Sequence, residues 1–412
     1  MKLNLNSISP AVFKVSASET ADGTQNRADI VASGRLLAYE YARKGANGVR
    51  AAMGIKENAG EQRLNETEYK ELNEAFQASH LLYAANMADA MVGKKSPETF
   101  DEFRRQGQNY YRNSMFYQVL QGLYQEILVP ILPRVYSEAV GVFADVVEVG
   151  FGETYSLSIG SNDIPVFQDS AWGAARSVPR NRFYSKDYTL NPQPKTAQIN
   201  AKWTQLVGTN TDFGQFFANI SAGLYAKTMG MWNAAMSAAI ADTAYVPSNL
   251  AVTFSNQNWM TLANRLAAVN NTQISNLIAH GNAVALSKVL PTQATGSTNV
   301  NMDAAIATLL GADYTRSGYL GEFMGIRLMP LVDAIVPGTQ NTTVTTILPS
   351  DKVFVMASNG RKPLTIGYNR DTPITLEVEP SKAGDMEIAV NMTIALDSVA
   401  IFESHIGVVT IS

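Results

Sequence analysis

The chain has 412 residues, of which 17% are charged and none is cysteine, and its formal net charge is -4 at pH 7. The absence of cysteine excludes disulfides, thiolate metal sites and cysteine nucleophiles. The lack of a basic excess argues against sequence-specific binding of nucleic acid. Because the charged fraction lies below the roughly 25% that is typical of soluble domains, we expect neighbouring molecules to cover part of the surface.

No segment is expected to cross a membrane or to direct secretion. The longest apolar stretch, residues 117–149, contains charged residues and two prolines, so it is too polar to span a bilayer. The N-terminal residues lack the apolar segment and the cleavage site of a signal peptide. The protein is therefore expected to be made and kept in a cytoplasm.

Residues 1–128 are predicted to be mainly helical. A short helix is expected at 28–44 and a longer one at about 61–92. Ser96 is a candidate N-cap for a third helix, which Pro130 should end. We interpret residues 1–60 as an arm and the helices that follow as a bundle that folds on its own; a specific binding role, such as clasping neighbouring subunits, is the alternative.

Residues 151–211 are predicted to form a long ribbon of two strands. Apolar and polar residues alternate from 155 to 159 and again from 199 to 203, as in half-buried strands. The tip between them has a basic excess, contributed by Arg176, Arg180, Arg182, Lys186 and Lys195. Excursions of this length are usually lids or binding loops, and an arm that grips another subunit belongs to the same class.

A long helix is predicted from 212 to 244. Asp212 is a good N-cap, and Pro247 enforces a stop. Two apolar stripes run along this helix at spacings of three and four residues, which predicts burial on two sides. At 1.5 Å per residue the helix would be about 45 Å long, and the rest of the chain is expected to be organised around it.

Behind this helix, short predicted helices and strands alternate, which favours a sheet flanked by helices. The expected helices are 257–269, 283–290 and 303–310, and the expected strands are 274–279, 323–331, 342–348, 352–357, 374–378 and 390–396. The last two strands alternate apolar and polar residues and are expected to be half-buried and antiparallel.

The order of these elements resembles that of the major capsid proteins of tailed bacteriophages. The resemblance covers residues 129–412, and its local cue is the stretch 314–329, which is punctuated by Gly318, Gly321 and Gly325. It implies the α+β capsid fold that encapsulins and the herpesvirus capsid floor share, with these glycines in a turn of the axial domain. Gly321 in particular is expected to adopt a positive φ.

The resemblance also implies a division of the chain. The parts are an N-terminal arm and helical region (1–128), a connection into the peripheral domain (129–150), an extended β-hairpin loop (151–211), the spine helix of the peripheral domain (212–247), an axial domain (248–370) and the β-strands of the peripheral domain (371–412).

The implied function is self-assembly into the pentamers and hexamers of an icosahedral phage head, in the virion, around double-stranded DNA that is bound without sequence specificity. No catalysis, cofactor, metal or membrane is implied; the partners are other copies, a portal, and scaffolding or decoration proteins. The contacts between subunits are expected at the loop tip, from Arg176, Arg180, Arg182 and Lys186. Some members of this family cross-link covalently through a lysine of this loop. An encapsulin-type nanocompartment shell is the alternative.

The sequence offers no catalytic constellation. Its three histidines, His80, His280 and His405, are isolated from one another and are expected to be packing or surface residues. Glu377 and Glu379 share a strand face, which is more typical of a solvated face than of paired acids for hydrolysis. A soluble hydrolase that uses residues 151–211 as a lid is the second alternative.

Overall fold

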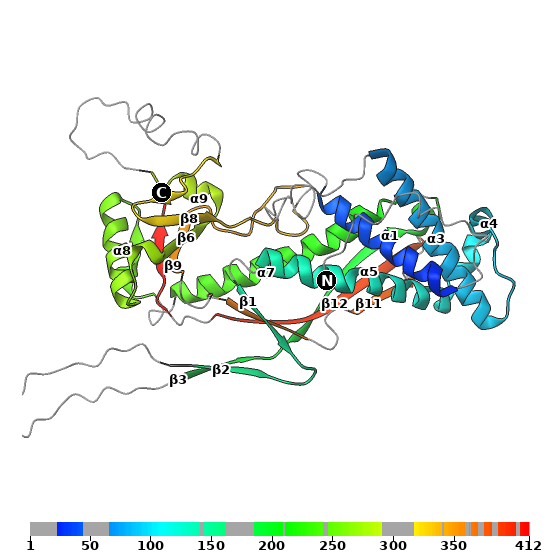
Figure 1. The fold of residues 1–412 in the computed structure, drawn as a ribbon, viewed down its shortest axis with the longest axis horizontal. Coiled ribbons are helices and arrows are strands. Elements are labelled where there is room, and N and C mark those ends of the chain that lie inside the picture. Colours follow the sequence, from blue (N-terminus) through cyan, green and yellow to red (C-terminus); the bar gives the residue numbers. More distant parts are fainter. Residues whose placement is uncertain are drawn as a thin grey trace, which may run out of the picture. The chain divides into compact units, whose positions relative to one another are not determined.

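The computed structural model describes residues 23–43, 66–140, 144–160, 185–208, 211–241, 246–290, 317–339, 342–358, 362, 364–369, 375–380, 386–400 and 404–411. Helices and strands are both abundant (Figure 1), which confirms the predicted α+β class. The chain divides into two compact units, each assembled from segments distant in sequence. Unit 1 comprises Met1–Val142, Pro192–Tyr225 and Tyr368–Leu396, and unit 2 comprises Phe143–Asn191, Ala226–Gly367 and Asp397–Ser412.

Unit 1 combines helices with an antiparallel sheet. Its elements are α1 (Gly23–Arg43), α3 (Glu66–Val92), α4 (Phe100–Tyr110), α5 (Ser114–Val140), β4 (Gln193–Lys202), α6 (Trp203–Val207), the first part of α7 (Phe213–Ala241), β11 (Thr375–Pro380) and most of β12 (Glu387–Ala400). The helices α1, α3 and α5 pack on one another, and α5 also packs on β11. Because β4 and β11 pair with the same stretch of β12, β12 lies between them.

The predicted N-terminal helices are present, but the predicted third helix is two helices, α4 and α5, separated by residues 111–113, and both of its predicted ends are wrong. α4 begins after Thr99, whose side chain accepts a hydrogen bond from the amide of Glu102, so Ser96 is not the N-cap. α5 continues through Pro130 as far as Val140. A proline removes one amide from the helical ladder and disturbs one turn, and the turns on either side still complete this helix.

The N-terminal helices do not form a bundle of their own, because their core includes residues from far along the chain. Phe76 and His80 of α3, Tyr124 of α5, and Phe213 and Phe217 of α7 form what we call the α7 cluster. The ring of Phe213 has its centroid 5.3 Å from Phe76, 4.7 Å from His80 and 6.2 Å from Tyr124. The first turn of α7 is therefore buried by α3 and α5.

A second aromatic cluster ties α4 and α5 to the sheet. Trp203 opens α6, is buried, and packs edge-on against Phe103 and Phe116 at centroid distances of 6.4 and 5.9 Å. Its amide donates to the carbonyl oxygen of Met386 at 2.8 Å. The sequence pattern placed Trp203 in a strand, whereas it is the first residue of α6, directly after β4 ends at Lys202.

His80 is held as a neutral ring inside the α7 cluster. Its Nδ1 lies 2.7 Å from the carbonyl oxygen of Phe76, so Nδ1 carries the proton, and Nε2 lies 3.3 Å from the hydroxyl of Tyr124, which donates to it. Burial in this apolar environment lowers the pKa of His80 to about 4. Protonation of His80 therefore costs more free energy in the folded protein than in the unfolded chain.

The helix α7 begins where the sequence predicts. The amide of Gln215 donates to Oδ1 of Asp212 at 3.1 Å, and the hydroxyl of Tyr69 donates to the same oxygen at 2.7 Å. Further along, in unit 2, Trp232 is buried and packs edge-on against Phe354 with the centroids 5.3 Å apart. Buried residues on both predicted stripes confirm that α7 is no ordinary surface helix.

Unit 2 is built on a mixed sheet with the strand order β5-β13-β9-β6-β8-β7. Its elements are β1 (Ala144–Val149), β2 (Tyr155–Gly160), β3 (Ser185–Leu190), the second part of α7, β5 (Ala251–Thr253), α8 (Asn256–Val269), β6 (Leu277–Gly281), α9 (Ala283–Ser287), β7 (Glu322–Phe323), β8 (Ile326–Pro330), β9 (Lys352–Ala357), most of β10 (Leu364–Asn369) and β13 (Gly407–Thr410). A Cβ on Gly407 would come within 3.0 Å of Leu262, so glycine allows α8 to lie close to β13.

Several predicted elements of this region are confirmed, and one is wrong. The helix at 257–269 and the strand at 352–357 are present. The segment 342–348, rich in β-branched residues, makes a single bridge between Thr346 and Ile335 and is not a strand. The predicted helix 303–310 lies outside the described residues.

The carboxylate of Asp333 explains why this segment is not a strand. Its Oδ1 accepts hydrogen bonds from the amides of Ile347 and Leu348 at 3.1 and 2.9 Å, and its Oδ2 accepts from the side chain of Asn282 at 2.6 Å. The amide of Leu348 thus bonds to a side chain, and the amide of Ile347 is shared between this side chain and the carbonyl oxygen of Ala334 at 2.9 Å, so the ladder of a strand does not continue past this point.

The hairpin between β7 and β8 turns on Met324 and Gly325, which have φ values of 48° and 81°. Positive φ at both central residues is characteristic of a type I′ turn. Gly318 also has a positive φ, of 76°, but Gly321 does not. The expectation for Gly321 is therefore wrong, and an added Cβ there would meet no atom within 4 Å.

The geometry of this hairpin predicts that valine substitutions at Gly325 and Gly321 have different effects on stability. Gly325→Val should destabilise unit 2 by roughly 1–2 kcal/mol, because a branched residue is strained at positive φ. Gly321→Val, in open space and without positive φ, should change stability by less than about 0.5 kcal/mol. Chemical denaturation of both variants measures the difference, and equal destabilisation would contradict this assignment of the turn.

The buried His80 predicts a loss of stability in mild acid. Its pKa is about 4 when folded and about 6.5 when unfolded, so the unfolded chain binds more protons between these values. The contribution of neutral His80 to the free energy of unfolding is complete above pH 6.5. It is lost as the pH falls towards 4, by on the order of 1 kcal/mol per pH unit. Denaturation of His80→Gln from pH 7.5 to 4.5 should give a shallower decline than wild type; parallel curves would refute this role.

Candidate functional site

The residues expected at the loop tip are mostly outside the described part of the chain. Arg176, Arg180 and Arg182 lie there, so their contacts stay a prediction. Lys186 belongs to β3, where its backbone is paired with Ile159 of β2.

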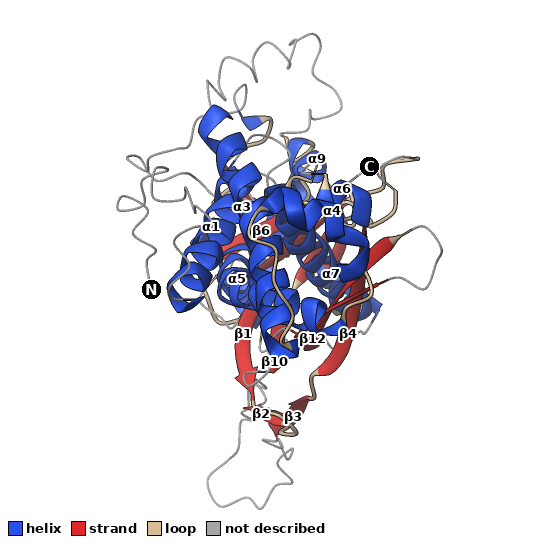
Figure 2. Cartoon of the chain, turned by 90° about the vertical axis from the view of Figure 1, so that its right-hand side faces the viewer, coloured by secondary structure: helices blue, strands red, loops and turns tan. Residues whose placement is uncertain are grey.

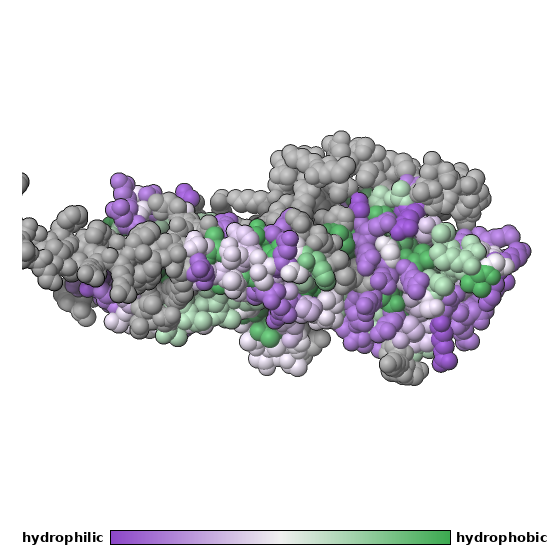
Figure 3. Space-filling model, turned by 90° about the horizontal axis from the view of Figure 1, so that it is seen from below, coloured by the Kyte–Doolittle hydropathy of each residue, from purple (hydrophilic) through white to green (hydrophobic). Residues whose placement is uncertain are grey.

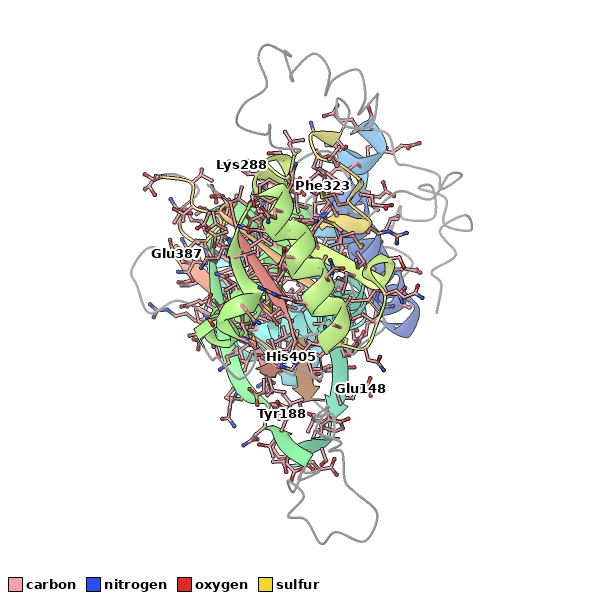
Figure 4. All side chains as sticks on the ribbon, turned by 90° about the vertical axis from the view of Figure 1, so that its left-hand side faces the viewer. Glu148, Tyr188, Lys288, Phe323, Glu387 and His405 are labelled. Carbon is pink, nitrogen blue, oxygen red and sulfur yellow. The ribbon has the colours of Figure 1, made fainter. Side chains whose placement is uncertain are left out.

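The strands of the predicted ribbon are paired differently from the expectation. β2 pairs antiparallel with β3, from Tyr155 opposite Leu190 to Gly160 opposite Ser185. The segment that was expected to return along β2 is β4, which pairs with β12 instead. β3 escaped notice because its sequence, SKDYTL, is largely polar and charged. Figure 4 labels Tyr188 on this strand.

The base of the ribbon is anchored inside unit 2. Leu190 is buried, and its Cβ would lie 3.4 Å from a Cβ placed on Gly367. The amide of the next residue, Asn191, donates to Oδ2 of Asp397 at 2.8 Å. The ribbon therefore leaves a fixed base, and its other residues from 155 to 158 and from 187 to 189 are exposed or half-buried.

A groove of about 500 Å³ lies in unit 2 between α7 and the segment 344–352. The side chain of Asn233 donates across it to the carbonyl oxygen of Ile347 at 3.0 Å. Its charged lining residues in the described chain are Asp351 and Lys352. This lining includes neither a histidine nor a pair of acids, so it offers no general base with an oriented partner.

In the described part of the chain, the histidines and acids do not converge on a site. His280 is buried like His80, and burial lowers its pKa to about 4; His405 bonds through its backbone to the side chain of Asn270. Glu377 and Glu379 are exposed, as expected of a solvated strand face. Within the described ranges, no three metal-binding side chains come together.

Several large apolar side chains are exposed on the surface. Phe151 is 78% exposed in the turn between β1 and β2, and Met91 and Val92 at the end of α3 are 61% and 56% exposed. On the face shown in Figure 3, hydrophobic residues form separate patches among hydrophilic ones. No helix in the part of the chain that the structure describes is long and apolar enough to span a membrane.

Sequence reasoning missed Asp333 and Met324, which shape the loops of unit 2. Asp333 has no partner at helical or strand spacing that would mark it, since its hydrogen-bond donors are the amides of Ile347 and Leu348 and the side chain of Asn282. Met324 could have been suspected from the two-residue spacing between Phe323 and Ile326, with glycine in the second position.

Comparisons with known proteins point to one family. The model of a family described as "SPbeta prophage-derived putative capsid protein YonB" matches residues 114–410, well over half of the chain. No curated protein matches.

Similar solved structures are phage capsids at low identity. The capsid of cyanophage P-SCSP1u is 11% identical with a TM-score of 0.39, over 65% of this chain and 85% of that chain. The mature capsid of bacteriophage PhiM1 is 9% identical with a TM-score of 0.42, over 65% and 85%. At such scores the conclusion rests on the family match. The chain belongs to the YonB capsid family, and it is a major capsid protein of a phage head.

Proposed function

We propose that this capsid protein associates with copies of itself to form the pentamers and hexamers of an icosahedral head, which encloses double-stranded DNA in the virion. The observation that carries the proposal is the family match over residues 114–410. Assembly takes place in the host cytoplasm. The reaction is association, and the protein performs no catalysis.

The surface chemistry supports association over catalysis. Charged residues are only 17% of the chain, and large apolar side chains such as Phe151 stand exposed. The groove beside α7 lacks a candidate set of catalytic groups. The hydrolase alternative needs titratable groups beneath the ribbon, and no described residue favours it.

In this proposal the ribbon extends to the next subunit, and its basic tip contacts that subunit. Arg180 and Arg182 would meet acids of a neighbouring copy, since the guanidinium fork suits carboxylates. An exposed ion pair contributes only about 0–1 kcal/mol. In a closed shell each subunit is held at several interfaces at once, so small contacts add up.

The spine, axial and peripheral parts have separate roles in this proposal. α7 provides rigidity, the sheet of unit 2 packs around the centre of a capsomer, and the strands near the C-terminus meet neighbouring capsomers. A portal and scaffolding or decoration proteins complete the head. With a net charge of -4, contact with DNA is weak and non-specific.

Electron microscopy with size-exclusion chromatography tests the proposal. The chain is expressed alone and together with its neighbouring genes, and closed shells, tubes or rings of five and six are expected. A clean monomer or dimer under every condition would overturn it. Nucleic acid inside the particles separates a phage head from an encapsulin, which would enclose an enzyme.

Reversal of charge at the tip tests the loop. Arg180→Glu combined with Arg182→Glu should leave the melting temperature unchanged and abolish closed shells, because the tip would repel the acids of its neighbour. The matched control is Arg104→Glu with Arg105→Glu, an equal change of charge at exposed positions of α4. Normal particles from the tip variant would contradict the proposed contact between the loop tip and the neighbouring subunit.

A further inference from the structure

The apolar face of α3 continues past the point where the rest of unit 1 covers it. α3 packs on α1, α4 and α5 (Figure 2), and its buried stripe includes Leu81, Ala84 and Ala88. Steps of three and four residues carry this stripe on to Met91 and Val92, which are 61% and 56% exposed. An apolar stripe on a helix normally faces a packing partner. In the described chain, the last turn of this stripe is left mostly exposed.

The chain that follows α3 folds away from the exposed end of the stripe. The amide of Lys94 donates to the carbonyl oxygen of Asp89 at 3.0 Å, as at many helix ends. The hydroxyl of Ser96 then donates to the carbonyl oxygen of Asn86 at 3.4 Å. Asn86 lies about 120–140° around the helix from the two exposed residues. Hydrogen bonds therefore hold this connection on the opposite side of α3, and the stripe is uncovered by construction.

Two exposed lysines, Lys94 and Lys95, follow the exposed apolar pair. We call Met91, Val92, Lys94 and Lys95 the α3 end. Lys95 lies 3.5 Å from Glu98 in an ion pair that is itself exposed, and such a pair contributes little, so Lys95 can exchange one acid for another. A partner that fits the α3 end carries an apolar side chain beside acidic ones.

The turn between β1 and β2 carries such a surface. Phe151 is 78% exposed, and the exposed acids Glu148 and Glu153 stand before and after it. Among the exposed large apolar side chains of the described residues, Phe151 alone has acids within three residues on both sides. The amide of Glu153 donates to the carbonyl oxygen of Gly150 at 3.0 Å, which closes a β-turn with Phe151 inside it. We call residues 148–153 the Phe151 turn.

The two surfaces are complementary, and neither is complementary to itself. The α3 end belongs to unit 1 and the Phe151 turn to unit 2, and both are exposed in the single chain. Between two copies, apolar side chains can meet apolar side chains while acids meet lysines. Two α3 ends or two Phe151 turns would instead oppose equal charges.

We propose that the Phe151 turn of one copy docks on the α3 end of a second copy. The ring of Phe151 covers Met91 and Val92, and a methionine suits contact with an aromatic ring. The contact is heterologous, so it builds rings or open chains. This inference rests on the proposed function, because it names a contact between copies in the shell. The family match begins at residue 114, so α3 lies outside the matched region.

Single cysteines in two different chains test this contact, because the chain has no cysteine of its own. A tagged chain with Met91→Cys is mixed with an untagged chain with Phe151→Cys and oxidised during assembly, so that a disulfide can take the place of the ring. Contacting side chains lie within disulfide range. A band that joins a tagged chain to an untagged chain is therefore expected on denaturing gels without reductant, and it can only link two copies.

The matched control replaces Met91→Cys by Val284→Cys. Val284 is 54% exposed on α9, and the exposed Lys288 follows it one turn later, so it is another apolar residue beside a lysine. Its linked fraction should be at least tenfold lower. Equal linkage from Val284, or intact particles without the linked band, would overturn the contact and leave shell assembly standing. A wild-type chain that never assembles would overturn both.

Reversal of charge on both sides gives a second test. Lys94→Glu with Lys95→Glu should keep the melting temperature and lower the yield of shells at least tenfold, because acids would oppose the acids of the Phe151 turn. Adding Glu148→Lys with Glu153→Lys to the same chain should restore the yield. If the lysines act only on the dipole of α3, the first change lowers the melting temperature and the second restores nothing, which would overturn the contact.

Discussion

The burial of Phe213 is the constraint on which unit 1 depends. This first residue of α7 is 1% exposed, and rings from α3 and α5 enclose it. Burial of one such side chain stabilises by about 1.5–3 kcal/mol, and the geometry of the rings adds to this. Three segments that are distant in sequence must therefore meet at one point before the long helix has a fixed start. The Asp212 cap lies beside the same point, because Tyr69 of α3 donates to it.

Because of this constraint, the N-terminal helices are part of the core of the capsid fold. The family match begins at residue 114, where α5 starts, so α1, α3 and α4 lie outside it. They still supply Phe76 and His80 to the α7 cluster and Phe103 to the cluster around Trp203. The helices are thus part of the core that holds the start of α7 and the sheet of β4, β11 and β12.

Local signals predicted much of the fold, and contacts between distant segments decided the rest. The Asp212 cap and the alternating residues of β11 and β12 mark their elements because each signal lies within a few residues. The partner of β4 could not be read in this way, since alternation shows a buried face but not which strand lies beside it. The Asp333 carboxylate overrode the β-branched residues of 342–348. A glycine shows where φ can be positive, not where it is, which separates Gly325 from Gly321. The tip arginines remain a prediction from charge alone.

Hydrogen exchange tests the central claim about the α7 cluster most directly. Exchange of the amides at 213–225 is compared between the full chain and a chain that begins at residue 114. Without α3 the first turns of α7 should lose their protection, whereas α8 and β9 in unit 2 should keep theirs. Equal protection at 213–225 in both chains would show that the start of α7 is fixed without the N-terminal helices, and would contradict this account.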